Sequence, residues 1–291
     1  MIGSSADALG VLAIGNSFSR NATEYLPQLA ASQGRGLILS HAALGGWSVQ
    51  RHWEAAEKHQ ADPRDPQGTP YALPGPDGTP RPASLERMLR SQPWDIVTFQ
   101  QHSLTAMDLD TYQPYAGQLA DYVRRHAPQA KLWMHETWAY RADHPLLKRR
   151  NLTQEQMYQR LRDAYATIAR QTAADWIIPV GTAFQTARHD PRWQLDVQED
   201  VHPQAFTYPD LPRQVHALCS GWRWDMKASP PVFGFDGKHC TPAGKYLGAM
   251  IWFGSLFGDI DSHPFAPAEL SPEDAAVLQD IARGPWRRSQ P

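Results

Sequence analysis

The sequence predicts an α/β protein, a three-layer α/β/α sandwich built around a mostly parallel sheet of five strands. Short apolar runs alternate along most of the chain with longer segments whose apolar residues recur at helical spacing. Glycine or polar residues follow the apolar runs, as expected where a buried strand ends. The chain has 291 residues, 42% of them hydrophobic, which is enough to bury one large core.

The elements can be placed in order along the chain. We expect strands at residues 10–15, 36–44, 96–100, 131–137 and 176–181. Segments of helical spacing occupy residues 23–34, 48–60, 112–127 and 153–173, and a last apolar helix follows Thr241, with Pro242 at its first position. Helical crossovers between successive strands produce parallel pairing. We expect the five-stranded sheet to be flavodoxin-like.

Two segments interrupt this alternation. Residues from about 60 to 84 are dense in proline and glycine, which predicts a surface loop with a short hairpin around Asp77 and Gly78. Residues from about 182 to 235 are rich in Trp, Pro and His, and we interpret them as an irregular insertion near a site, or a lid. Because the alternation resumes after the first segment, we expect a single domain over residues 1–291.

Composition argues against several classes of partner. The formal net charge is −2 and no long basic run occurs, so nucleic acid is not expected. The apolar stretch "YLGAMIWFGSLFG" is shorter than the roughly 20 residues that span a bilayer, so no membrane segment is expected. The start lacks a basic region typical of a signal peptide, while a secreted or periplasmic protein whose leader has been removed stays open.

The histidines and cysteines do not suggest a metal or another cofactor. The twelve histidines show no H-E-x-x-H pattern and no cluster at ligand spacing. Cys219 and Cys240 can form one bridge in an oxidising compartment or remain two buried thiols.

One junction between a strand and a helix carries a polar triplet. In "VLAIGNSFS", Gly15, Asn16 and Ser17 follow the first apolar run. Asn and Ser are good helix caps and Gly allows a turn, so the triplet can be purely structural. Alternatively, Ser17 is a nucleophile presented where the helix begins.

Other chain segments favour the nucleophile. Loops leaving the carboxyl ends of parallel strands meet at one edge of the sheet, and Gly45-Gly46 and Gln100-Gln101 lie at two further ends of this kind. Near the end of the chain, Asp236 and His239 form a D-x-x-H pair. Such a pair supplies both the base that a serine nucleophile needs and the carboxylate that orients the base.

These blocks resemble those of the SGNH (GDSL-like) hydrolases, and among them a little-characterised branch with "GNSFS", "QQ" and "DGxHxTxxG" blocks. The resemblance implies that Ser17 of "IGNSFS" is the nucleophile and that Asp236 and His239 of "DGKHCTPAGKYL" complete the triad. The backbone amides of Ser17 and Gly46, the latter in "LGGWS" with Gly45 as alternative, would bind the oxyanion. Where the family often has G-x-N-D this chain has "FQQHS", so the Gln101 or Gln100 amide would replace the Asn.

The resemblance implies a serine esterase that removes a small acyl group, with acetyl on a carbohydrate as the expected ester. Several branches of the family act on acetylated carbohydrates, and flat aromatic rings at a pocket rim suit sugars. A lipase or thioesterase of the same fold, and a carbohydrate-binding protein without turnover, are the alternatives. The expected partner is a small-molecule or polysaccharide ester.

Substrate contacts are expected from two segments. Trp47, Arg51 and His52 follow the glycine pair, so they can line the pocket or form an ordinary first helical turn. In "HETWAYR", Glu136 and Trp138 follow the fourth strand, where they can contact substrate or pack in the core.

Overall fold

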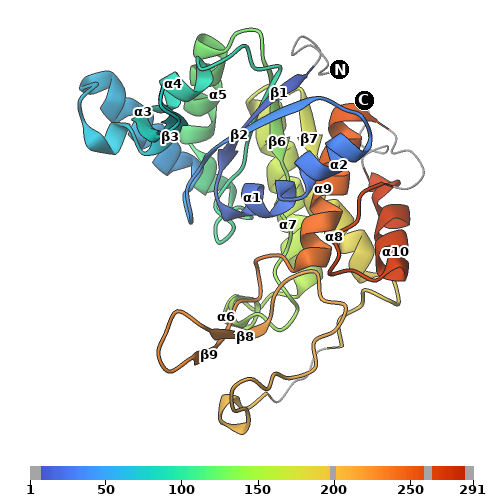
Figure 1. The fold of residues 1–291 in the computed structure, drawn as a ribbon. Coiled ribbons are helices and arrows are strands. Elements are labelled where there is room, and N and C mark those ends of the chain that lie inside the picture. The colour runs from blue at the N-terminus through green and yellow to red at the C-terminus, as the bar shows by residue number, and fades with distance from the viewer. Residues whose placement is uncertain (1–7, 197–200, 259–263, 286–291) are drawn as a thin grey trace.

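A computed structural model describes residues 8–196, 201–258 and 264–285. Its central sheet has five parallel strands in the order β2-β1-β5-β6-β7 (Figure 1). The strands are β1 (Leu9–Gly15), β2 (Leu37–Ala43), β5 (Ile96–Phe99), β6 (Lys131–His135) and β7 (Trp176–Ile178). The predicted fold class is therefore confirmed, and the strand order is the flavodoxin-like one.

The register of the sheet brings three loops to one edge. Gly15 at the end of β1 pairs with Ala43 at the end of β2. Ile14 pairs with Phe99 at the end of β5. Since these parallel strands stop at the same level, the segments beginning at Asn16, Leu44 and Gln100 leave the sheet side by side.

Helices cover both faces of the sheet (Figure 1). On one face, α9 packs against α1, α2, α8 and α10, and on the other α3 packs against α4 and α5 while α7 covers β6 and β7. The α-helices have these bounds: α1 (Ser17–Thr23), α2 (Leu26–Ser32), α3 (Val49–Ala61), α4 (Leu85–Leu89), α5 (Tyr115–His126), α6 (Pro145–Arg149), α7 (Gln154–Gln171), α8 (Val180–Arg188), α9 (Pro242–Phe257) and α10 (Pro272–Ala282). Short 3₁₀ turns lie at η2 (Pro66–Gly68), η3 (Leu109–Tyr112) and η4 (Pro203–Ala205).

Two helical segments differ from the prediction. The helix expected over residues 23–34 is two helices, because Pro27 lies in the first turn of α2 and cannot continue a preceding helix. The predicted irregular segment begins inside α8, whose buried residues Val180, Ala183, Phe184 and Ala187 repeat at helical spacing. This helix is hard to recognise in the sequence, because its apolar repeat is short and directly follows the apolar residues of a strand.

Two hairpins project from the sandwich. Strands β3 (Tyr71–Pro74) and β4 (Pro80–Ala83) form the hairpin predicted around Asp77 and Gly78. Strands β8 (Trp222–Asp225) and β9 (Val232–Phe235) form a second hairpin, drawn at the lower left of Figure 1. Strand β9 ends one residue before Asp236, so this hairpin leads into the predicted D-x-x-H loop. No helix in the described part of the chain is long and apolar enough to cross a membrane.

Candidate active site

The turn between β1 and α1 separates the two roles considered for its polar residues. Asn16 is the helix cap: its side-chain Oδ1 accepts from Phe18 N at 3.0 Å. Its Nδ2 also donates to Trp47 O at 2.9 Å, which ties the exits of β1 and β2 together. Ser17 is the first helical residue and is half-buried, and its hydroxyl is not used as a cap.

The hydroxyl of Ser17 instead lies against a histidine from the far end of the sequence. Ser17 Oγ and His239 Nε2 are 2.9 Å apart. On the other side of the ring, His239 Nδ1 lies 2.9 Å from Oδ2 and 3.1 Å from Oδ1 of Asp236. Because an ionised carboxylate only accepts, Nδ1 carries the hydrogen and Nε2 of a neutral ring is left to accept the Ser17 proton.

The Asp236 carboxylate is more enclosed than the His239 imidazole. The side chain of Asp236 is 7% exposed, and that of His239 is 36% exposed. Burial by itself would raise the pKa of Asp236. That pKa nevertheless lies below its usual range, because the carboxylate accepts hydrogen bonds from the ring and backbone of His239 and from Lys238 N, and because the charge of a protonated His239 ring stabilises the carboxylate. Asp236 is therefore ionised at neutral pH.

The loop that carries Asp236 and His239 is held from three sides. Trp138 Nε1 donates to Lys238 O at 2.8 Å. Asn21 Oδ1, on α1, accepts from Cys240 N at 2.8 Å. Thr241 then caps α9, accepting from Gly244 N. These contacts connect the loop to both α1 and the core, so the distance between His239 and Ser17 is fixed by the fold.

The backbone near Ser17 offers donors for a developing oxyanion. Gly46 is exposed and has φ +71°, a conformation that favours glycine. Among the described residues, the amides of Ser17 and Gly46 make no backbone hydrogen bond. Both N–H groups are thus available to a ligand at this edge of the sheet.

The two glutamines after β5 have a different role from the predicted one. Gln101 is fully buried; its Nε2 donates to Thr111 O at 3.0 Å and its Oε1 accepts from Val49 N at 3.0 Å. Gln100 is also buried, and its Nε2 donates to Gln101 O at 3.1 Å. Since both Nε2 groups are committed to carbonyls, the structure corrects the prediction that one of them completes the oxyanion hole. They fix the loop instead.

Two of the predicted substrate contacts, His52 and Trp138, also require correction. His52 is fully buried, with Nε2 2.9 Å from Gly15 O and Nδ1 2.7 Å from the Tyr71 hydroxyl. Trp138 is fully buried and stacks between Phe18 and Phe184, with ring centroids 4.2 and 4.7 Å away. Both side chains pack in the core behind the segments that carry Ser17 and His239. Of the group that follows the glycine pair, Trp47 and Arg51 remain accessible.

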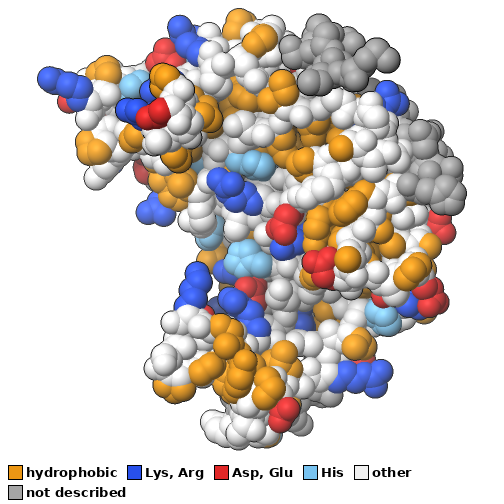
Figure 2. All heavy atoms as spheres, viewed as in Figure 1, with side chains coloured by type: hydrophobic (Ala, Val, Ile, Leu, Met, Phe, Trp, Pro, Cys, Tyr) orange, Lys and Arg blue, Asp and Glu red, His pale blue; other side chains and the backbone are white. Residues whose placement is uncertain are grey.

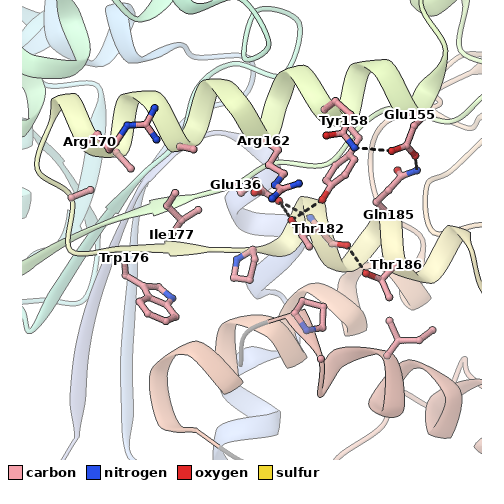
Figure 3. A pocket seen from close by; sticks show the side chains of 18 of the residues that line it. Glu136, Glu155, Tyr158, Arg162, Arg170, Trp176, Ile177, Thr182, Gln185 and Thr186 are labelled. Atoms are coloured by element: carbon pink, nitrogen blue, oxygen red, sulfur yellow. Dashed lines mark hydrogen bonds between the residues drawn. The ribbon is translucent and has the colours of Figure 1, made fainter. Parts of the chain in front are cut away.

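Glu136 lies outside the region of Ser17. It lines a separate groove of about 1240 Å³ between α7, β7, α8 and α10, shown in Figure 3. Its Oε1 accepts from the backbone and hydroxyl of Thr182 at 2.6 and 2.8 Å. Burial raises the pKa of Glu136 to about 7, against the opposing effect of these bonds. The prediction that Glu136 contacts a substrate bound at Ser17 is therefore wrong, because its side chain faces Thr182 instead.

Asn21 is not among the residues predicted from the sequence, yet it lies at the site. Its Oδ1 accepts from Cys240 N and so holds the D-x-x-H loop. Its position four residues after Ser17, on the same helical face, was the available signal. Within the described ranges, no group of three or more His, Cys, Asp or Glu side chains could hold a metal ion.

Comparison with known proteins places the chain in a family. Residues 10–220 match the family described as "Domain of unknown function (DUF4886)". The chain belongs to this family. The matched stretch contains Ser17 and ends before the loop of Asp236 and His239, which the structure brings to it. No curated protein matches the sequence.

Solved structures resemble the whole fold. A DUF4886 family protein from Bacteroides uniformis is 26% identical with a TM-score of 0.72, over 95% of this chain and 94% of the other. A protein from Slackia heliotrinireducens assigned to the SGNH hydrolases is 19% identical with a TM-score of 0.51, over 84% of this chain and 97% of the other. The DUF4886 chain therefore has the fold of the SGNH hydrolases, in agreement with the resemblance of its sequence blocks.

Proposed function

We propose that this DUF4886 protein is a serine esterase that uses Ser17, His239 and Asp236. The single observation that carries the proposal is the hydrogen-bonded series from Ser17 Oγ to His239 Nε2, at 2.9 Å, and from His239 Nδ1 to Asp236. A serine hydroxyl is a weak nucleophile unless a base removes its proton and a third group fixes the base. Here the three groups come from the two ends of the chain, and a helix cap alone would not require them.

The proposed reaction is acyl transfer to water. His239 Nε2 takes the proton of Ser17 as Oγ attacks the ester carbonyl, and Asp236 stabilises the imidazolium that forms. The N–H groups of Ser17 and Gly46 bind the oxyanion. His239 then gives its proton to the leaving alcohol, and a water molecule, deprotonated by the same ring, releases the acid from the acyl-enzyme.

For the substrate, we propose a small acyl ester, acetyl, carried by a carbohydrate. Support comes from the hairpin that leads into Asp236. Trp222 stacks on Phe233 and lies edge-on to Phe235, both with ring centroids 5.1 Å away, and all three rings are partly exposed. Figure 2 shows hydrophobic side chains gathered over the lower part of the molecule, where this hairpin lies. Flat aromatic surfaces stack on the apolar faces of sugar rings.

The test compares matched serine variants on an aryl acetate and on acetylated polysaccharides. Ser17→Ala and His239→Ala should each lower kcat by at least about 1000-fold, since the triad acts as a unit. Ser255→Ala on α9, whose hydroxyl donates to Ile251 O, is the control and should retain activity. Circular dichroism of each variant checks that the chain is folded.

Labelling separates an enzyme from a binding protein of the same fold. A fluorophosphonate should modify Ser17, identified by mass spectrometry of the peptide, and should fail to modify Ser17→Ala. Near-native turnover by Ser17→Ala would refute the assignment. Binding of acetylated polysaccharide with neither labelling nor acetate release would support the non-catalytic alternative, and preference for long-chain acyl esters would replace the acetyl assignment by a lipase.

A further inference from the structure

Two cations lie beside the candidate triad without carboxylate partners. Lys238 is between Asp236 and His239; its backbone N donates to Asp236 Oδ1 at 3.1 Å, and its ammonium makes no ion pair within the described ranges. Arg51, in the first turn of α3, lies over the ring of Trp47 at 5.8 Å and likewise has no acidic partner among the residues described. Neither side chain is needed to hold its own element.

His102, at the β5 exit, is near enough to both cations for their charges to act on its ring. Gln101 Oε1 accepts from Val49 N at 3.0 Å and from His102 N at 2.8 Å, which brings the exit of β5 against the start of α3. Burial lowers the pKa of His102, and the charges of Lys238 and Arg51 lower it further. The ring is therefore neutral at pH 7 and offers an N–H donor. We call the two cations Arg51 and Lys238, together with the neutral donor His102, the cationic arc.

The carboxylate beside Lys238 in the chain is already paired. Asp236 is hydrogen-bonded to His239 and also lies 3.5 Å from Nη2 of Arg223, a further cation on β8. Asp143, whose charge acts on His144 together with the charges of Lys238 and Asp236, pairs with Arg141 at 2.7 Å. Figure 2 shows Lys, Arg and His side chains along the hollow between the body and the lower hairpin. Positive charges gathered this way repel one another until an anion enters.

We propose that the cationic arc binds a negatively charged group on the alcohol side of the ester, so that the substrate is an acylated anionic saccharide bearing a carboxylate or a sulfate. The inference rests on the proposed esterase function and deepens it. Arg51 follows the β2 exit, His102 follows the β5 exit and Lys238 belongs to the loop of Asp236 and His239, so the arc comes from three segments that meet at the edge of the sheet where Ser17 lies. The β8–β9 hairpin precedes Asp236 in the chain. A charged sugar can contact both the arc and the hairpin, with its ester at Ser17.

The first test uses three aryl acetates of similar size: phenyl acetate, 3-acetoxybenzoate and 3-acetoxy-N,N,N-trimethylanilinium. We expect kcat/KM, corrected for each ester's spontaneous hydrolysis, to be highest for the carboxylated ester and lowest for the cationic one. We expect this order to weaken as ionic strength rises, because salt screens the charges. Equal values for all three at low salt would overturn the inference and leave the esterase assignment intact. No hydrolysis of phenyl acetate or of either charged ester would instead mean that the proposed function itself has failed.

Charge-removing variants then locate the effect. Lys238→Gln and Arg51→Gln should each lower the ratio of kcat/KM for 3-acetoxybenzoate over phenyl acetate by about tenfold, as expected for one nearby unit charge at intermediate dielectric. Arg64→Gln is the matched control, because it removes the same charge from an exposed loop beyond the other end of α3 and should leave the ratio unchanged. An equal drop in all three variants would show a general charge effect and refute the arc.

Acetylated polysaccharides distinguish the two anions. Acetate release is measured from acetylated polygalacturonate, from an acetylated sulfated galactan and from acetylated xylan of low charge. Faster release from the first supports a carboxylate, and faster release from the second supports a sulfate. Fastest release from the low-charge xylan contradicts the proposal.

Discussion

Replacing Trp138 by Phe tests whether this ring supports the triad loop or contacts substrate. Phe keeps the stack between Phe18 and Phe184 but removes the N–H that donates to Lys238 O at 2.8 Å. An enclosed carbonyl left unpaired costs roughly 1–3 kcal/mol. The smaller ring adds about 1 kcal/mol for the cavity, at ~24 cal/mol per Å³. The free energy of unfolding should therefore fall by about 2–4 kcal/mol.

The same substitution should affect turnover more than binding. Lys238 O precedes His239 in the chain, so releasing it lets the imidazole move away from Ser17. A displacement of about 1 Å can cost up to about 100-fold in rate. We expect kcat to fall between about 10- and 100-fold while KM stays within about twofold. The assays are urea unfolding and Michaelis kinetics with an aryl acetate.

Trp252→Phe provides the matched control. Trp252 is also fully buried, but its Nε1 has no partner in the described part of the chain. It should lose only about 1 kcal/mol for the cavity and keep its kcat. If Trp138→Phe instead raised KM with unchanged stability, Trp138 would contact substrate and the reasoning from its burial would fail.

Two further predictions concern groups near or behind the site. Burial raises the pKa of Glu136 to about 7, so the folded state holds its proton more tightly than the unfolded state. The stabilisation by the protonated carboxyl is fully present below about pH 4 and is lost as pH rises through 7. In urea unfolding, Glu136→Gln should therefore be more stable than wild type at pH 8 but not at pH 5. An equal difference in the free energy of unfolding at both pH values would contradict this. Cys219 and Cys240 face each other in an antiparallel bridge as free thiols, and mild diamide treatment should join them, seen as a loss of two alkylatable thiols by mass spectrometry. Persistence of both thiols, with Cys240→Ser as reference, would show that the pair does not close.

The parts of the site that the sequence predicts are those set by local order along the chain. A strand followed by Ser17, and a D-x-x-H pair before an apolar helix, are visible because each depends on a few consecutive residues. The parallel sheet then determines that both reach one edge. Gly46 belongs to the same class, since a turn with φ +71° selects glycine.

The residues whose roles were predicted wrongly are those whose role depends on the direction in which the side chain packs. Glu136 and Trp138 do follow a strand, but the chain there turns so that Glu136 faces Thr182 on α8 while Trp138 packs between rings from α1 and α8. The glutamines after β5 are correctly placed at the sheet edge, yet their amides satisfy backbone groups of the loop. Strand exits predict proximity to a site, and only packing decides which atoms are left for a ligand.

The contact of His52 with Tyr71 connects the β3–β4 hairpin to the strand that leads to Ser17. Burial lowers the pKa of His52 to about 4, so the ring is neutral; its Nε2 donates to Gly15 O and its Nδ1 accepts from the Tyr71 hydroxyl. Gly15 is two residues before Ser17. The β3–β4 hairpin is thus connected by hydrogen bonds through one imidazole to the strand that precedes Ser17. A variant that lacks residues 71–83 loses the Tyr71 hydroxyl that donates to His52, so it needs another donor there to hold the end of β1 in place.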